Sequence, residues 1–302
     1  MTDPAHEQRR QRLTGIALMC GTVFVFACLD ATAKYLGTQM PTLQVVGVRC
    51  VTAFLIALSI SNPISRPGLL KTNRLLLQLV RASMLLGSTM FNFMAFRYLQ
   101  LDEAMAILFS TPFLIAIFAG PVLGEWVGWR RWTAIMVGFA GVLVVVRPGM
   151  GGMQWAALLS FGSAICYAAY NIATRMLART DSSETTLFYA NLFGAAVMAP
   201  VLPFVWTAPP TWLDIVLMLA MGIFGAGGHF LLILAHRRAP ASVLSPFIYT
   251  QIVWASTFGY LVFGNVPSHW TVAGAGIVIA SGLYLLNRER KLHAAVAPIE
   301  TG

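Results

Sequence analysis

The sequence predicts an all-α integral membrane protein with ten transmembrane helices, arranged as two inverted five-helix repeats around a central cavity. Apolar residues make up 58% of the 302 residues and charged residues 10%, with a mean hydropathy of +0.73. A soluble domain carries about a quarter charged residues. Apolar runs of roughly 20 residues, the length that spans a bilayer as a helix, recur along the whole chain. These runs also repeat at a nearly constant spacing.

The second half of the chain repeats the first at an offset close to 140 residues. Because each copy has an odd number of spans, the second copy enters the bilayer from the opposite side. Many carriers build two oppositely facing states from inverted repeats, so this pattern predicts a transporter. The aligned pairs are Gly21 and Gly162, Asp30 and Asn171, Lys34 and Arg175, Leu36 and Leu177, Gly87 and Gly227, Ala95 and Ala235, Arg97 and Arg237, Phe118 and Phe258, Gly124 and Gly264, Trp132 and Trp270, and Gly138 and Gly276.

Short connections rich in Pro, Gly and Asn separate the runs and set the expected spans. Residues 1–148 form the first repeat, residues 153–290 the second, and residues 291–302 a cytoplasmic tail. Pro112 and Pro246 are expected to interrupt the fourth and ninth spans. The spans are predicted at 13–35, 43–61, 75–97, 103–123, 131–147, 154–176, 186–206, 212–234, 243–263 and 270–287.

The basic residues are distributed unevenly between the two ends of these spans. Three of them, Lys34, Arg97 and Arg147, fall on one side, and 15 fall on the other. The positive-inside rule then places both termini in the cytoplasm. The basic residues lie in short clusters between apolar runs, so the net charge of +9 does not indicate binding to nucleic acid. The 15 are Arg9, Arg10, Arg12, Arg66, Lys71, Arg74, Arg130, Arg131, Arg175, Arg179, Arg237, Arg238, Arg288, Arg290 and Lys291.

The sequence does not favour an enzyme. Its spans contain no pair of acidic residues, its five histidines are scattered, and Gly-x-Ser-x-Gly and Walker A motifs are absent. The four cysteines fall inside spans and are expected as small core residues, so neither a metal site nor a cofactor is predicted. The first apolar run is too long for a signal peptide.

Charges within the spans are candidates for function because they are costly in a bilayer. Asp30 lies about five residues from the outer end of the first span and four before Lys34, which puts both on one helix face. One interpretation is an interfacial ion pair; the other is a charged outer gate that meets a zwitterionic substrate. Asn171 and Arg175 repeat this spacing at the cytoplasmic end, so Asp30, Lys34 and Arg175 are the candidate gate residues.

Two arginines and one histidine also lie inside spans. Arg49 and Arg81 are expected to snorkel or to bind nearby carbonyls. His229 is a better site candidate because it lies near mid-span after the glycines at 225, 227 and 228, which permit close approach of another helix. A structural histidine bound to a carbonyl is the alternative.

Polar and aromatic side chains form stripes on three further helices. As a set they suit a pocket for an organic solute with apolar bulk and almost no fixed charge. The alternative is ordinary helix packing through hydrogen-bonded Ser and Asn. With His229, the candidate substrate-binding residues are Ser88, Asn92, Tyr167, Tyr170, Asn171, Ser245, Tyr249, Gln251 and Trp254.

Several motifs together carry a family resemblance over nearly the whole chain. Val48-Arg49 stands where an aromatic-Arg pair is common, and Leu123-Gly124-Glu125 follows a Pro-containing fourth span. The second copy has Asn265 in place of the Glu. These features resemble the drug/metabolite transporter superfamily in its ten-span, EamA-type branch, and residues 241–264 look closest to bacterial amino-acid exporters, including the aromatic ones.

The resemblance implies a secondary transporter of the bacterial inner membrane that exports small organic solutes, above all amino acids, by alternating access. It also implies that spans 1, 3, 4, 6, 8 and 9 line the cavity, with span 2 peripheral and spans 5 and 10 at the back. The alternatives are uptake or exchange of another metabolite or a cationic drug, and a non-transporting scaffold or pore. The expected partners are the substrate and the lipid bilayer, with the chain a monomer or weak homodimer. Transport is expected to be gradient-driven or weakly proton-coupled.

Overall fold

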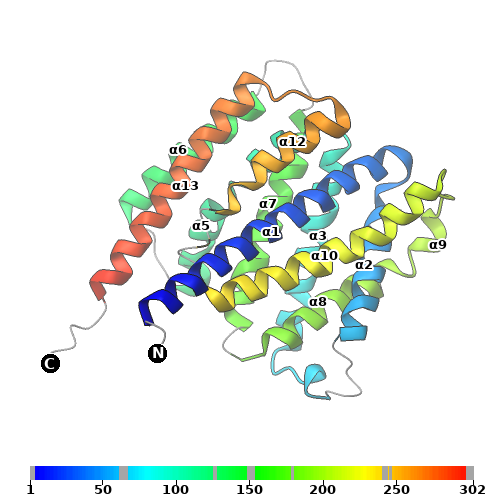
Figure 1. Ribbon diagram of the computed structural model, residues 1–302, viewed down its shortest axis with the longest axis horizontal. Helices are drawn as coiled ribbons and strands as arrows, with labels where there is room; N and C mark the ends of the chain where they lie inside the picture. Colours follow the sequence, from blue (N-terminus) through cyan, green and yellow to red (C-terminus); the bar gives the residue numbers. More distant parts are fainter. Residues whose placement is uncertain are drawn as a thin grey trace.

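Every regular element in the described part of the chain is a helix (Figure 1). The computed structural model describes residues 4–60, 67–124, 128–147, 154–177, 180–239, 244 and 247–296. The helices are α1 (Pro4–Gln39), α2 (Thr42–Ile60), the 3-10 helix η1 (Pro67–Leu70), α3 (Leu75–Phe96), α4 (Leu101–Leu108), α5 (Thr111–Leu123), α6 (Trp129–Val146), α7 (Gln154–Leu177), α8 (Ser183–Met198), α9 (Leu202–Val205), α10 (Trp212–Arg238), α12 (Gln251–Phe263) and α13 (His269–Val296).

Six helical segments are long and apolar enough to cross a membrane: 10–39, 42–59, 75–96, 101–123, 155–177 and 212–238. The multi-pass membrane class is therefore confirmed, and helices also overlie the remaining predicted spans. That all of them cross, to give ten spans, stays a prediction. The main difference from the predicted spans is at the first one. α1 continues to Gln39, so Asp30 lies nine residues from the end of the helix rather than about five.

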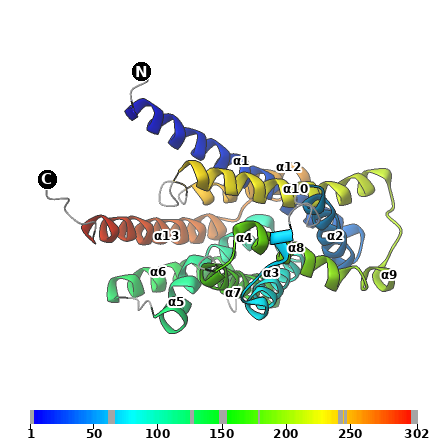
Figure 2. The ribbon, with the colours of Figure 1, turned by 90° about the horizontal axis from the view of Figure 1, so that it is seen from below.

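The helices pack in pairs that follow the sequence repeat. In chain order, α1, α2, α3, α4–α5 and α6 correspond to α7, α8, α10, α12 and α13. α1 packs against α10 as α7 packs against α3, while α2 meets α8, α4 meets α12 and α6 meets α13. Figure 2 shows α1, α10 and α13 in one layer and their counterparts α7, α3 and α6 in the other. This is the pattern of two repeats related by a two-fold axis.

The helix breaks also occur at matching positions. A turn at Phe109–Ser110 separates α4 from α5, with Pro112 in the first turn of α5, and Thr250 takes the place of Ser110 before α12. The Phe109 and Tyr249 rings meet edge to face with centroids 5.2 Å apart. Because these two residues are also 140 apart, they are repeat counterparts in contact. The expected break at Pro246 lies outside the described residues.

Two glycines end α5 and α12 in the same way. Gly124 has φ 73° and Gly264 has φ 68°, the left-handed conformation that glycine adopts without a Cβ clash. Each donates its backbone N–H to the last turn of the preceding helix, Gly124 to Gly120 and Gly264 to Tyr260. The pair aligned by sequence therefore forms two equivalent C-caps.

The pair formed by α6 and α13 is held at close range by Gly141 and Gly274. A Cβ at Gly274 would lie 2.6 Å from the carbonyl oxygen of Gly141, and one at Gly141 would lie 2.9 Å from that of Gly274. Backbone contact of this kind requires small residues at the crossing. The two helices lie beside the rest of the bundle in Figure 1 and position no side chain in the cavity described next.

Candidate functional site

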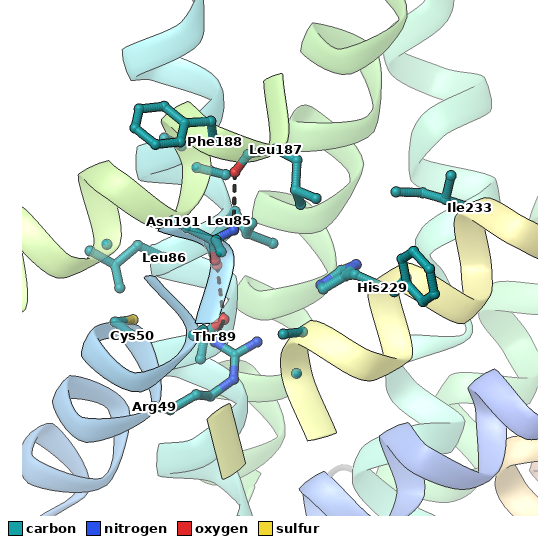
Figure 3. A pocket seen from close by; sticks show the side chains of 18 of the residues that line it. Arg49, Cys50, Leu85, Leu86, Thr89, Leu187, Phe188, Asn191, His229 and Ile233 are labelled. Carbon is teal, nitrogen blue, oxygen red and sulfur yellow. Dashed lines mark hydrogen bonds between the residues drawn. The ribbon is translucent and has the colours of Figure 1, made fainter. Parts of the chain in front are cut away.

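A cavity of about 310 Å³ lies between α2, α3, α8 and α10 (Figure 3). Tyr170 from α7 also lines it. Most of its lining is apolar. Its polar and charged lining side chains are Arg49, Cys50, Thr89, Tyr170, Glu184, Asn191, His229 and Arg237. This volume is at the lower end of the range for small-molecule sites, about 300–1,000 Å³.

The cavity reaches one end of the bundle. Glu184 in the first turn of α8 and Arg237 in the last turn of α10 border it, and both side chains are exposed. That this end faces the cytoplasm is the prediction of the positive-inside rule. At the other end α3 packs against both α1 and α2, whereas among the described residues α10 makes no comparable contact with the counterparts α7 and α8. The two-fold pattern is thus broken where the cavity opens.

Arg49 lies deep in this cavity, away from its opening, and has few hydrogen-bond partners. Its Nη1 is 3.5 Å from the Thr89 hydroxyl, at the outer limit of a hydrogen bond, and its Nε is buried without a partner. The guanidinium faces the Phe93 ring at 5.8 Å from the centroid. A Cβ at Gly225 would lie in ordinary van der Waals contact with Nε, at 3.7 Å, so α10 passes directly beside the Arg49 guanidinium.

Arg81, in contrast, is hydrogen-bonded to the protein through all three of its guanidinium nitrogens. Its guanidinium donates to the Thr174 hydroxyl at 2.7 Å, the Thr186 carbonyl at 2.9 Å and the Tyr170 hydroxyl at 2.9 Å. It also lies over the Tyr170 ring, 4.5 Å from the centroid. Arg81 therefore ties α3 to α7 and α8, as the expected binding to a carbonyl foresaw, while Arg49 retains unused donors.

His229 faces the same space as Arg49 from the opposite helix (Figure 3). The glycine beside it explains its position, because a Cβ at Gly228 would lie 2.5 Å from Cε1 of Phe26. α1 and α10 can approach only where that Cβ is missing, as the glycine run predicts. The His229 ring meets Phe26 edge to face with centroids 5.2 Å apart.

Of the ten predicted substrate-binding residues, Tyr170 and His229 line this cavity. Ser88 instead exchanges hydrogen bonds with Ser163, which fastens α3 to α7. Asn171 donates to the Tyr167 carbonyl one turn earlier at 2.7 Å, and the Tyr167 ring stacks on Tyr170.

The candidates on and around α12 are also engaged elsewhere. Tyr249 is 8% exposed, and its hydroxyl occupies the space that a side chain at Gly282 would need. Trp254 meets Phe24 edge to face at 4.9 Å, and Gln251 donates to Asp30 at 3.0 Å.

Asn92 and Ser245 are the last two candidates. The Asn92 side-chain oxygen is buried without a partner, away from the cavity lining. Ser245 lies outside the described residues.

The candidate gate residues have partners that differ from the expected ion pair. Lys34 is 9% exposed, and its Nζ donates to the carbonyls of Phe96 at 2.9 Å and Leu99 at 2.5 Å, at the end of α3. Asp30 accepts from Gln251 on α12. Arg175 lies exposed in the last turn of α7.

Further acidic residues lie near Lys34. Asp102 and Glu103 are in the first turn of α4, inside the span at 101–123, and both act electrostatically on Lys34. The span at 101–123 therefore contains a pair of acidic residues, contrary to the expectation for the predicted span at 103–123, because helix α4 begins two residues earlier and so includes Asp102.

Sequence reasoning missed Arg49, Thr89, Asn191 and Arg237 as cavity residues and treated α2 as peripheral. One available signal was the repeat: Thr89 is the counterpart of His229 at the offset of 140, so a site at His229 implied one at Thr89. The expectation of a pocket almost without fixed charge also differs from the cavity, which carries two arginines and one glutamate.

Comparison with known proteins gives both a family and a fold. A model of the EamA-like transporter family matches residues 13–147 and again residues 154–288. A relative named S-adenosylmethionine uptake transporter, from Rickettsia prowazekii, is 26% identical and covers 92% of this chain and 94% of its own. A riboflavin transporter from Vibrio cholerae is 26% identical, with 92% and 95% covered, and a pseudopaline exporter from Pseudomonas aeruginosa is 24% identical, with 92% and 97% covered.

One solved crystal structure shares the fold, with a TM-score of 0.62 at 17% identity over 93% of this chain and 99% of the other. The repeated family match agrees with the paired packing of α1–α6 and α7–α13. The chain therefore belongs to the EamA-like transporter family and is a multi-pass membrane protein that transports a small molecule.

Proposed function

We propose that the chain is a secondary transporter of the bacterial inner membrane that moves amino acids and compounds built from them by alternating access. The observation that supports this proposal is the cavity between α2, α3, α8 and α10, open at one end and closed at the other. The four helices form two repeat-related pairs, so exchanging their contacts would open the opposite end. Both termini are proposed to be cytoplasmic, and the substrate-binding residues are proposed to be those of the cavity.

Export is the first candidate for the direction, because the cavity reaches the predicted cytoplasmic face and a cytoplasmic solute can enter it. Uptake is the second candidate, supported by relatives that are named for uptake. A cationic drug fits this cavity poorly because its lining carries Arg49 and Arg237. The protein shows no ATP-binding motif, so solute gradients are proposed to set the net direction.

Flux into proteoliposomes tests the proposal with a panel of amino acids, S-adenosylmethionine and riboflavin. A carrier gives saturable flux that unlabelled substrate competes, whereas flux that rises linearly with concentration would show a pore. No flux for any amino acid or for S-adenosylmethionine, with or without flux of riboflavin, would refute the proposed substrate class. Gly225→Leu fills the cavity beside Arg49 and is expected to abolish flux. Gly227→Leu is the matched control, since no atom lies within 4 Å of a Cβ there.

A further inference from the structure

We infer that the cavity holds a subsite for a carboxylate of the substrate, with the Arg49 guanidinium as its principal ligand. This inference rests on the proposed function, because it concerns the solute that enters the transport cavity.

The first argument is the number of unused donors on Arg49. A guanidinium carries five N–H donors, and those on Arg49 have two weak partners in the described residues, the Thr89 hydroxyl at 3.5 Å and the neighbouring Cys50 thiol, while Nε has none. In the described part of the chain no carboxylate lies within ion-pair distance of Arg49. The Asp30 carboxylate acts on Arg49 only from farther away, and its hydrogen bond comes from Gln251. A buried cation without a paired anion is costly, and a bound carboxylate removes that cost.

The second argument is the contrast with Arg81 one helix away. Arg81 has the same chemistry and is also buried, and each of its three guanidinium nitrogens donates one hydrogen bond, to Thr174, Thr186 and Tyr170. Where an arginine holds helices together, the protein thus supplies acceptors for its hydrogen-bond donors. Arg49 is left underbonded and faces a cavity, which is the arrangement of a binding group.

The third argument is the charge balance of the cavity. Arg49 and Arg237 line it from α2 and α10, the charges of Arg49 and Arg81 both reach His229, and Glu184 is the one acidic lining residue, at the exposed mouth. Among the lining residues in the deep part of the cavity Arg49 is therefore the charged group, with Asp30 acting on it from outside the lining, and Thr89 and Asn191 can supply neutral polar contacts there. A zwitterionic amino acid would place its carboxylate at Arg49 and its apolar part against the leucine and phenylalanine walls.

Binding to purified protein tests the subsite without any need for flux. The probes are L-phenylalanine and L-methionine, each paired with its carboxamide, and the readout is the ligand-dependent rise in melting temperature during titration. We expect the acids to bind and the amides to bind roughly 10- to 100-fold more weakly, the effect of losing a charge-assisted hydrogen bond. Arg49→Met should remove this preference, and Arg49→Lys should retain part of it.

Lys71→Met is the matched control, because it removes one exposed positive charge outside the cavity and should leave the preference unchanged. Equal affinity of acid and amide for the unmodified protein, unchanged preference in Arg49→Met, or no binding of either acid would each overturn the subsite. Flux separates the two proposals: transport that persists with unchanged acid preference in Arg49→Met refutes the subsite alone. Acid binding without flux of any panel member refutes the transport proposal alone.

Discussion

Lys34 fastens the closed end of the bundle, and its replacement should open that end. The ammonium of Lys34 on α1 donates two hydrogen bonds to carbonyls at the end of α3 while almost fully buried. The counterpart pair, α7 and α10, lies apart where the cavity opens, so opening the other end requires α1 to leave α3. Lys34→Met removes both bonds without removing the apolar stem.

The size of the effect follows from the bonds lost. A hydrogen bond to a charged group contributes about 1.5–3 kcal/mol. A loss of roughly 2 kcal/mol is a factor of about 30 in an equilibrium between two states. If the state open to the outside holds about 1% of the unmodified protein, it would then rise to roughly a quarter.

Cys50 reports this change because it lines the cavity as a free thiol. In a protein that keeps Cys50 and has serine at the other three cysteines, a membrane-impermeant thiol reagent added outside cells labels Cys50 only when the outer end opens. We expect labelling about 20-fold faster in Lys34→Met. Arg97→Met, which removes an exposed cation at the same end, should label at the parent rate. A Lys34→Met rate within about twofold of the parent would refute this reasoning, as would an equal gain in Arg97→Met.

Three further outcomes are expected. Gly228→Ala should destabilise the purified protein by about 1–3 kcal/mol through overpacking, whereas Gly227→Ala should leave its melting temperature nearly unchanged; equal effects would contradict the packing argument. Asp181 lies outside the spans, where slight burial acts to raise its pKa but hydrogen bonds from Thr72, Gln78, Asn73 and Thr180 outweigh it and lower the pKa. The stabilisation by the ionised Asp181 should therefore be present above about pH 4 and lost as pH falls through the lowered pKa. The difference in melting temperature between the unmodified protein and Asp181→Asn should shrink from pH 7 to pH 3. A constant difference would contradict this. A reporter active only in the periplasm should be inactive at the C-terminus, and activity there would overturn the topology.

The repeat was the part of the fold that could be predicted from sequence in most detail. An offset of 140 placed Gly124 opposite Gly264, and both end a helix in the left-handed conformation. The conformation of such positions is predictable because a helix that ends in the left-handed conformation favours glycine at that residue, whatever surrounds it. The same offset relates Phe109 and Tyr249, but their contact across the molecule depends on how the repeats dock, which periodicity does not contain.

The site was predicted less well, because polarity within a span has two causes that look alike in sequence. Ser88 and Asn171 satisfy hydrogen-bonding needs of the helices themselves, with partners on the neighbouring helix and one turn back. Arg49 and Arg81 look equivalent as isolated charges in apolar runs, and only their partners distinguish them. Whether a polar side chain already has its hydrogen bonds within the protein is a property of the packed bundle.

In the outward-facing state each repeat would adopt the conformation that the other has now. Because α2 and α3 correspond to α8 and α10, the same four helices would form the cavity that faces outward. Thr89 and His229 would then trade roles in its wall. Arg237, which borders the present opening, is replaced by its counterpart Arg97 at the other end of the bundle. An anionic group would thus meet one guanidinium on arrival from either side of the membrane before reaching Arg49, so this attraction acts in both directions and leaves the net direction to the solute gradients.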